Sequence, residues 1–125
     1  MDIKETIGQK LFLAFDGKVT TPEIITALKE YRPGGLTLFR HLNIDNPGQV
    51  RELTDTLQHL AKGFNLPLLL IATDQEGGQL TAIGEGTTPL PGNMALGATG
   101  SINLARKAGA VLGGELAAKI GRAHV

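Results

Sequence analysis

An apolar run without alternation, Pro67-Leu68-Leu69-Leu70-Ile71-Ala72, most restricts how this chain can fold. A half-exposed strand alternates apolar and polar residues, so the run predicts a strand that is covered on both faces. Such strands belong to parallel α/β sheets, in which ligands bind at the carboxyl ends of the strands. The run is followed by Asp74, Glu76 and the pair Gly77-Gly78. We therefore expect these two carboxylates at a binding or catalytic edge.

The remainder of the chain alternates between helix and strand patterns. Alternation at this spacing predicts βαβ units with right-handed crossovers, and so an α/β fold built on a parallel sheet. So few strands leave both outer strands without a partner, and the chain looks like the beginning of a larger fold. In chain order we expect a helix over 3–9, a strand over 10–15, a helix over 22–31, a strand over 36–39, a helix over 47–63, a strand over 66–73, a long loop over 77–100, and a last helix capped by Thr99 or Ser101.

Apolar residues at helical spacing mark the faces that these helices should bury. Two of the helices begin with a hydroxyl or amide residue followed by proline, Thr21-Pro22 and Asn46-Pro47, which is typical of a helix start. The expected buried faces carry Ile24, Ile25, Leu28 and Tyr31 in the first of these helices, Val50, Leu53, Leu57, Leu60 and Ala61 in the second, and Leu104, Ala108, Val111, Leu112 and Leu116 in the last helix.

Composition argues against several classes of partner. The chain has 12 basic and 12 acidic residues, so it lacks the electrostatic signature of a protein that binds nucleic acid or an acidic membrane surface. No apolar run approaches the roughly 20 residues that span a bilayer, and the polar N-terminus has no signal-peptide core, so we expect a cytoplasmic location and no membrane partner. Cysteine is absent, and the histidines His41, His59 and His124 are too scattered to predict a metal site.

Four segments carry a resemblance to a known family. They cover residues 7–12, 33–39, 73–78 and 89–97, and the helical segment 104–117 adds to them. Their order and spacing resemble the N-terminal domain of glycoside hydrolase family 3, in particular its bacterial β-N-acetylhexosaminidase-like and β-glucosidase-like members. The resemblance implies a TIM-type (β/α)8 barrel, which usually needs about 250 residues. Residues 1–119 would then form its N-terminal part, about three βα units.

The resemblance also implies a chemistry. In this family the aspartate of the Asp-Gln-Glu-Gly-Gly motif binds sugar hydroxyls, which implies that Asp74 is a substrate-binding residue. An ionised carboxylate suits this role because it accepts directional hydrogen bonds from neighbouring hydroxyls. The family's lysine-histidine motif and its aspartate nucleophile lie downstream of this region, so no catalytic residue is expected in this chain. The implied parent is a retaining glycoside hydrolase of β-linked sugars or N-acetylamino sugars, with a carbohydrate substrate, no cofactor and no metal, and its oligomeric state is left open.

Three other charged residues are candidates for the same pocket. Asp16 and Arg40 follow the first two expected strands, and Glu76 lies two residues beyond Asp74. The carboxyl ends of parallel strands share one edge, which would bring these side chains near a bound sugar. Ordinary solvation or ion pairing at the ends of loops explains Asp16 and Arg40 equally well, and the same applies to His41. Glu76 is more readily explained as a cap for loop amides than as a catalytic partner of Asp74.

Alternatives remain open. Family members that cleave N-acetylglucosamine often carry arginines just after the glycine pair, where this chain has Gln79 and Ala82, so the sugar is not fixed. A non-catalytic sugar-binding module of the same ancestry would keep Asp74 without a nucleophile. A different parallel α/β-barrel enzyme, such as a phosphate-sugar aldolase or isomerase, would require a phosphate-binding glycine loop and a catalytic lysine at a strand end, and neither pattern occurs here.

The last six residues, Ile120-Gly121-Arg122-Ala123-His124-Val125, depart from the family's pattern. They resemble the translation of a sequencing adapter, and we therefore expect residues 120–125 to form a non-native tail. The alternative is a polar helix end, with Gly121 as the stop and basic residues near the negative end of the helix dipole. Because the family's catalytic motifs are missing from the sequence, we expect the isolated chain to be inactive.

Overall fold

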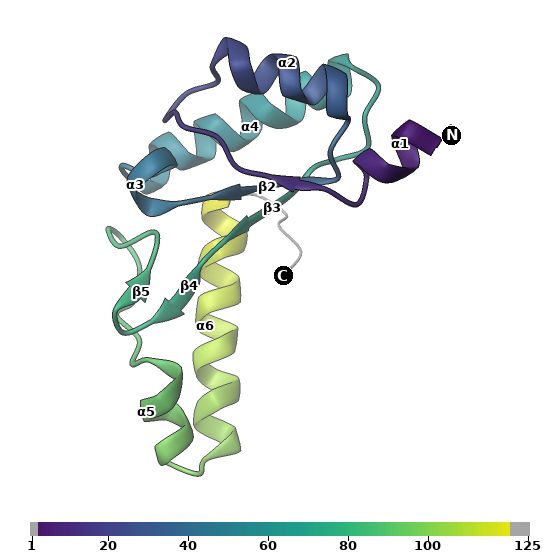
Figure 1. Cartoon of the computed structure of the whole chain (residues 1–125). Helices are drawn as coiled ribbons and strands as arrows, with labels where there is room; N and C mark the ends of the chain where they lie inside the picture. The colour runs from purple at the N-terminus through teal and green to yellow at the C-terminus, as the bar shows by residue number, and fades with distance from the viewer. Residues whose placement is uncertain (1–2, 121–125) are drawn as a thin grey trace.

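A parallel sheet of three strands with helices on one face forms the body of the molecule (Figure 1). The computed structural model describes residues 3–120. The sheet has the order β1-β2-β3, and the body consists of β1 (Phe12–Leu13), α2 (Pro22–Tyr31), β2 (Gly35–Leu38), α4 (Pro47–Gly63) and β3 (Leu70–Thr73). The remaining elements are α1 (Ile3–Gly8), α3 (Arg40–Asn43), β4 (Gln75–Gly77), β5 (Leu80–Thr81), α5 (Asn93–Ala98) and α6 (Ile102–Ile120).

Helical crossovers join the strands, which is why both strand pairs are parallel. Leu36 of β2 pairs with Leu13 on one side and with Ile71 on the other. This arrangement confirms the expected α/β class and parallel order. The third strand begins at Leu70 rather than at residue 66, because the backbone of Leu69 bonds to the side chain of Gln58 in α4 instead of to a neighbouring strand.

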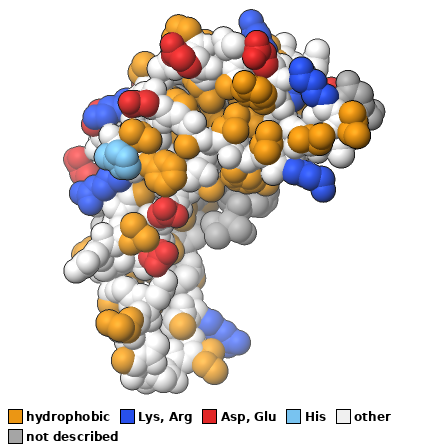
Figure 2. Space-filling view, in the orientation of Figure 1, with side chains coloured by type: hydrophobic (Ala, Val, Ile, Leu, Met, Phe, Trp, Pro, Cys, Tyr) orange, Lys and Arg blue, Asp and Glu red, His pale blue; other side chains and the backbone are white. Residues whose placement is uncertain are grey.

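The two faces of the sheet have different surroundings. Leu36, Leu38 and Ile71 are buried beneath the helices. On the opposite face Phe12 and Leu70 flank Gly35 in the register and are 48% and 41% exposed. The expectation that the apolar run is covered on both faces is therefore wrong for this chain, since no second layer among residues 3–120 covers that face. Figure 2 shows hydrophobic side chains gathered over the region where β1 and β2 run.

The main core lies between this sheet and helices α2 and α4. Ile24 and Leu28 of α2 are buried as expected, whereas Tyr31, at the C-terminal end of that helix, is 53% exposed. In α4 every expected core residue is buried or partly buried. The Asn46 side chain accepts a hydrogen bond from the Gln49 amide at 3.0 Å, so the expected helix start is confirmed. The buried apolar residues of the sheet and these helices are Ile24, Leu28, Leu36, Leu38, Val50, Leu53, Leu57, Ala61 and Ile71.

Helix α6 projects away from the body, and its C-terminal end packs beside α4 (Figure 1). Ser101 accepts a hydrogen bond from the Leu104 amide at 3.3 Å, which confirms the expected cap. Leu116 and Ile120 reach the core, but Leu104 and Val111 are exposed because α5 covers little of the projecting part. Residues 121–125, which carry most of the tail hypothesis, lie outside the described residues.

The segment expected to be one long loop contains regular structure. β4 and β5 form an antiparallel hairpin whose turn, Gly78-Gln79, places Gly77 and Gly78 at φ values of 78° and 59°. Glycine adopts these angles without the steric cost that a Cβ would bring. Helix α5 follows before α6 begins. The sequence pattern missed these elements because each is only 2–6 residues long, which is too short to show a period.

Two of the segments with family resemblance meet at the start of the sheet. The Gly34 amide donates hydrogen bonds to the carbonyls of Gly8 and Leu11, both at 3.1 Å. A Cβ atom on Gly8 would lie 2.1 Å from the Tyr31 carbonyl oxygen, so only glycine permits this approach. These glycines therefore serve packing at the end of the sheet opposite to Asp74, and not ligand binding.

The uncovered sheet face should cause self-association. Unpaired strand edges beside exposed apolar side chains favour contact between copies of a chain. We expect the purified chain to aggregate as its concentration rises in sedimentation velocity, and Leu70→Lys to reduce the aggregated fraction. Val19→Lys is the matched control, because Val19 is 69% exposed in a loop outside the sheet. A wild-type chain that stays monomeric at high concentration would contradict this expectation.

Candidate functional site

A pocket of about 220 Å³ lies at the carboxyl ends of β2 and β3. Asp74 follows β3 directly, and Arg40 and His41 begin the short helix α3 just beyond β2. The hairpin of β4 and β5 supplies the remaining side. The lining residues are Leu38, Phe39, Arg40, His41, Asp74, Gln79, Leu80, Thr81 and Ala82.

The sheet register explains why these residues meet. Leu38 and Thr73 are partners at the last position of the β2–β3 ladder, and the Thr73 hydroxyl donates to the Leu38 carbonyl at 2.9 Å. The residues that follow the two strands therefore emerge side by side at one edge. This is the edge at which parallel α/β folds bind ligands. The position expected for Asp74 from the sequence is thus the position that it occupies.

The charged groups of the pocket are available to a ligand. The Asp74 side chain is exposed, and no side chain or backbone amide among residues 3–120 bonds to its carboxylate. The Arg40 guanidinium likewise has no carboxylate partner within the described part of the chain. A carboxylate and a guanidinium that line one pocket without pairing offer both acceptors and donors to a hydroxylated molecule.

Asp16 lies elsewhere. It lines a separate hollow of about 570 Å³ between the end of β1 and helix α2, together with Glu23 and Tyr31. The structure therefore brings together Asp74, Arg40 and His41, and it does not bring Asp16 into their pocket. A contact between Asp16 and a sugar stays a prediction.

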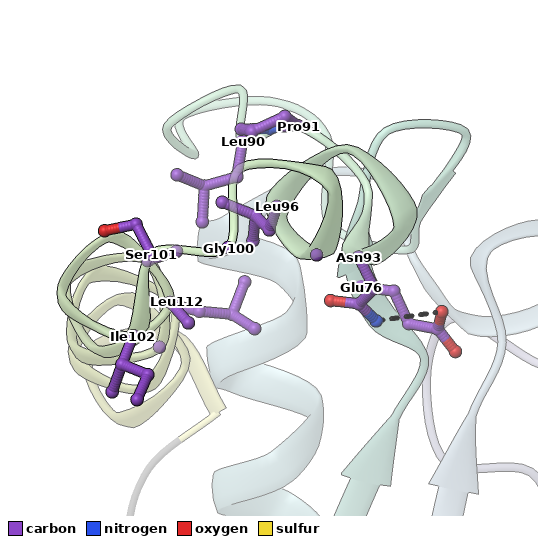
Figure 3. Close-up of a pocket in the computed structure, with 13 residues that line it drawn as sticks. Glu76, Leu90, Pro91, Asn93, Leu96, Gly100, Ser101, Ile102 and Leu112 are labelled. Carbon is purple, nitrogen blue, oxygen red and sulfur yellow. Dashed lines mark hydrogen bonds between the residues drawn. The ribbon is translucent and has the colours of Figure 1, made fainter.

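Glu76 lines a third pocket, of about 420 Å³, between the end of β4 and the helices α5 and α6 (Figure 3). Its Oε2 accepts a hydrogen bond from Asn93 Nδ2 at 3.4 Å. Leu90, Leu96 and Leu112 contribute apolar walls, so the pocket is mainly a gap beside α6. Glu76 lies two residues beyond Asp74 in the chain. Its side chain nevertheless bonds to Asn93 of α5 and does not line the Asp74 pocket.

The loop between the hairpin and α5 is fastened to α6 by Glu115. The Thr88 hydroxyl and amide donate to the Glu115 carboxylate at 2.6 and 3.0 Å. These hydrogen bonds, first from the side chain and then from the backbone of Thr88, lower the pKa of Glu115, with a smaller contribution from Lys119. Lys119 also donates to the Gly86 carbonyl at 2.8 Å, so two residues of α6 fix this loop.

A buried asparagine that the sequence reasoning missed organises the same edge of the sheet. Asn43 is 0% exposed. Its Nδ2 donates to the carbonyls of Phe15 and Gly17, both at 3.0 Å, and its Oδ1 accepts from the Phe39 amide at 2.9 Å. The side chain thereby joins the loops that follow β1 and β2. Only burial distinguishes Asn43 from a surface asparagine, and a single sequence does not show burial.

Neither a metal-binding cluster nor a membrane-spanning helix is found within residues 3–120. Within residues 3–120, no group of three or more His, Asp or Glu side chains is arranged to hold a metal ion. His59 is exposed on α4 and its Nδ1 lies 2.7 Å from the Asp55 carbonyl oxygen. In the same described range, no helix has the length and apolar character needed to cross a bilayer.

Comparisons with family models and with curated proteins point to one family. The model of the glycosyl hydrolase family 3 N-terminal domain matches residues 3–121. Beta-hexosaminidase A of Pseudoalteromonas piscicida is 36% identical over 113 residues, which cover 76% of this chain and 19% of that protein. A beta-hexosaminidase of Alkalilimnicola ehrlichii is 41% identical over 81 residues, which cover 65% of this chain and 22% of the relative.

Solved structures agree with the sequence relatives. A glycoside hydrolase family 3 beta-N-acetylglucosaminidase from Paenibacillus superimposes with a TM-score of 0.89 at 38% identity, over 94% of this chain and 22% of that structure. NagZ from Neisseria gonorrhoeae, solved in complex with N-trifluoroacetyl-D-glucosamine, gives a TM-score of 0.73 at 31% identity, over 88% of this chain and 33% of that structure.

The chain spans about a fifth to a third of the length of these relatives. Its three parallel strands and their helices match part of the barrel of the family, and the open sheet is what an incomplete barrel would present. The fold class implied by the sequence resemblance is therefore confirmed. The chain belongs to glycosyl hydrolase family 3 and corresponds to part of its N-terminal (β/α)8-barrel domain.

Proposed function

We propose that the full-length protein containing this chain is a retaining glycoside hydrolase that cleaves β-linked N-acetylamino sugars or related β-glycosides. Residues 1–119 would supply the first part of its barrel and one side of its sugar pocket. The observation that carries the proposal is the unpaired Asp74 carboxylate, which lines a pocket at the carboxyl ends of two parallel strands.

The chemistry of the pocket supports Asp74 as a sugar ligand. A carboxylate accepts charge-assisted hydrogen bonds, and two adjacent hydroxyls of a pyranose ring match its two oxygens. Arg40, on the other side of the pocket, offers donors to a ring hydroxyl or to an amide oxygen. Asp16 and Glu76 would contact the ligand only if a larger substrate extended beyond this pocket.

The relatives favour an N-acetylamino sugar over glucose. The curated relatives are named beta-hexosaminidases, and one matching structure holds an N-acylated glucosamine analogue. The hairpin has Gln79 and Ala82 where family members that cleave N-acetylglucosamine often carry arginines, so recognition of the acyl group would fall to other residues. Ala82 is buried, which leaves no room for an arginine side chain without rearrangement of the hairpin.

The proposed catalytic step uses residues outside this chain. A retaining mechanism needs a nucleophilic carboxylate and a general acid, held about 5 Å apart on either side of the scissile bond. Asp74 and Glu76 line different pockets, so they do not form such a pair. We infer that the aspartate nucleophile and the acid/base residue come from the remainder of the full-length protein.

The test compares the full-length protein with the 125-residue chain on chromogenic β-N-acetylglucosaminide and β-glucoside. We expect the full-length protein to hydrolyse the first faster, with retention at the anomeric carbon, and the 125-residue chain to show no turnover. Hydrolysis by the short chain that Asp74→Ala abolishes would refute the assignment of the nucleophile. If the full-length protein binds N-acetylglucosamine in calorimetry but hydrolyses neither substrate, it is a sugar-binding module instead.

A further inference from the structure

Gln75, which lies between the two carboxylates of the motif, holds the hairpin against the strand end. Its side chain is 8% exposed, unlike the exposed side chains of Asp74 and Glu76. Gln75 Nε2 donates to the Ile83 carbonyl at 3.1 Å, and the Ile83 amide donates to Gln75 Oε1 at 2.9 Å. One amide side chain therefore satisfies both backbone groups of a buried residue.

This pair of hydrogen bonds continues the ladder of the hairpin. The Ala82 amide donates to the Asp74 carbonyl at 3.1 Å, next to the Gln75–Ile83 pair. Successive side chains of an extended chain point to opposite sides, so Gln75 enters the interior while Asp74 faces the pocket. The backbone of Asp74 and the pocket wall at residues 80–82 are thus held by the same contacts.

Loss of the Gln75 side chain would leave one backbone group without a partner. The Ile83 carbonyl also accepts from the Thr87 hydroxyl at 2.9 Å, but no other acceptor for the Ile83 amide is found among residues 3–120. A buried amide without an acceptor is costly, so the segment around Ile83 would move to find one. Such movement would carry the wall at 80–82 away from Asp74.

We propose that Gln75 is a positioning residue, which sets the Asp74 carboxylate and the opposing wall at residues 80–82 at the spacing that a sugar ring requires. This inference rests on the proposed function. Positional errors of about 1 Å in a binding site cost up to about 100-fold in rate. We therefore expect Gln75→Met, which keeps the size of the side chain and removes both hydrogen bonds, to raise KM of the full-length protein about tenfold or more.

The structure offers a matched control at the other end of β3. Gln58 of α4 makes the same pair of hydrogen bonds, with its Nε2 donating to the Leu69 carbonyl at 2.8 Å and its Oε1 accepting from the Leu69 amide at 2.9 Å. Leu69 is buried and precedes β3, whereas the pocket lies beyond the opposite end of that strand. Gln58→Met should lower thermal stability to a similar extent and leave KM unchanged.

KM separates positioning from simple destabilisation. A partly unfolded sample contains less active enzyme, which lowers the apparent kcat and leaves KM as it was. A misplaced binding group raises KM. Gln75→Met in an Asp74→Ala background should add less than it does in the wild type, because one of the two groups that Gln75 positions is already missing. If Gln75→Met does not fold, Gln75→Ala, which also removes both hydrogen bonds to Ile83, is measured by the same criteria.

The outcomes distinguish this inference from the proposed function. An unchanged KM in Gln75→Met, beside a loss of activity in Asp74→Ala, would refute the positioning role alone. Equal losses from Gln75→Met with and without Asp74 would also refute it, because the two residues would then act independently. Full activity of Asp74→Ala would refute the proposed function itself, and the positioning role with it.

Discussion

Asp74→Ala in the full-length protein is expected to lower kcat/KM for a β-N-acetylglucosaminide by about 100- to 1,000-fold. Each hydrogen bond to a charged acceptor contributes about 1.5–3 kcal/mol, and a carboxylate holding two ring hydroxyls makes two of them. Two such bonds at the lower end of that scale contribute about 3–4 kcal/mol together. This loss corresponds to the expected fold-change, since about 1.4 kcal/mol is a factor of ten. The measurement is steady-state hydrolysis of the chromogenic substrate.

Asp55→Ala is the control for this substitution. Asp55 is an exposed carboxylate of α4 that pairs with Arg51 at 3.1 Å, so its loss removes the same charge at a distance from the pocket. Its kcat/KM should remain at the wild-type value. Asp74→Asn adds a further comparison, because the amide keeps the shape of the side chain but offers only one acceptor oxygen and no charge. Equal activity of Asp74→Ala and Asp55→Ala would show that Asp74 does not bind the sugar.

The second large effect is expected on stability, from Asn43→Leu. The substitution keeps the branched outline of a fully buried side chain and removes its three hydrogen bonds to Phe15, Gly17 and Phe39. Each buried backbone group left without a partner costs about 1–3 kcal/mol, so we expect the free energy of unfolding to fall by about 3 kcal/mol or more. Urea denaturation at low protein concentration measures this quantity.

Asn103→Leu is the matched control for Asn43→Leu. Asn103 lies on α6, is exposed, and makes no side-chain hydrogen bond within the described residues. The same change of residue type there should alter the free energy of unfolding by no more than about 0.5 kcal/mol. If the two variants were equally stable, Asn43 would not be the link that joins the loops after β1 and β2.

Much of the candidate site could be predicted from the sequence, because the signals for its strands and helices lie in neighbouring residues. The strand that ends before Asp74 and the helix starts at Pro22 and Pro47 rest on neighbouring residues, so the sequence alone contains these signals. Parallel topology then places everything that follows the strands at one edge. This is why Asp74 and Arg40 were expected to meet, and they line one pocket.

Other features of the site could not be predicted, because they depend on contacts between residues that are far apart in the sequence. Asp16 follows a strand, as Arg40 does, yet it lines a hollow beside α2 because β1 has only two residues and its loop turns toward that helix. The burial of Leu68 and Leu70 was expected from their apolar character, but burial requires a covering layer and none lies over them among residues 3–120. An apolar side chain favours burial, but it is buried only where another part of the fold packs against it.

By itself, the sequence determined the α/β class, the family, the order of the strands β1 to β3 with the helices α2 and α4 between them, and the carboxylate at the end of the third strand. The tertiary structure alone decided that Gln75 and Asn43 are interior amides bonded to distant backbone, and that Glu76 turns away from Asp74 toward Asn93. The physical reason is that strand and helix signals arise from neighbouring residues. A hydrogen bond from a buried side chain instead depends on which backbone groups the completed fold leaves within about 3 Å of it.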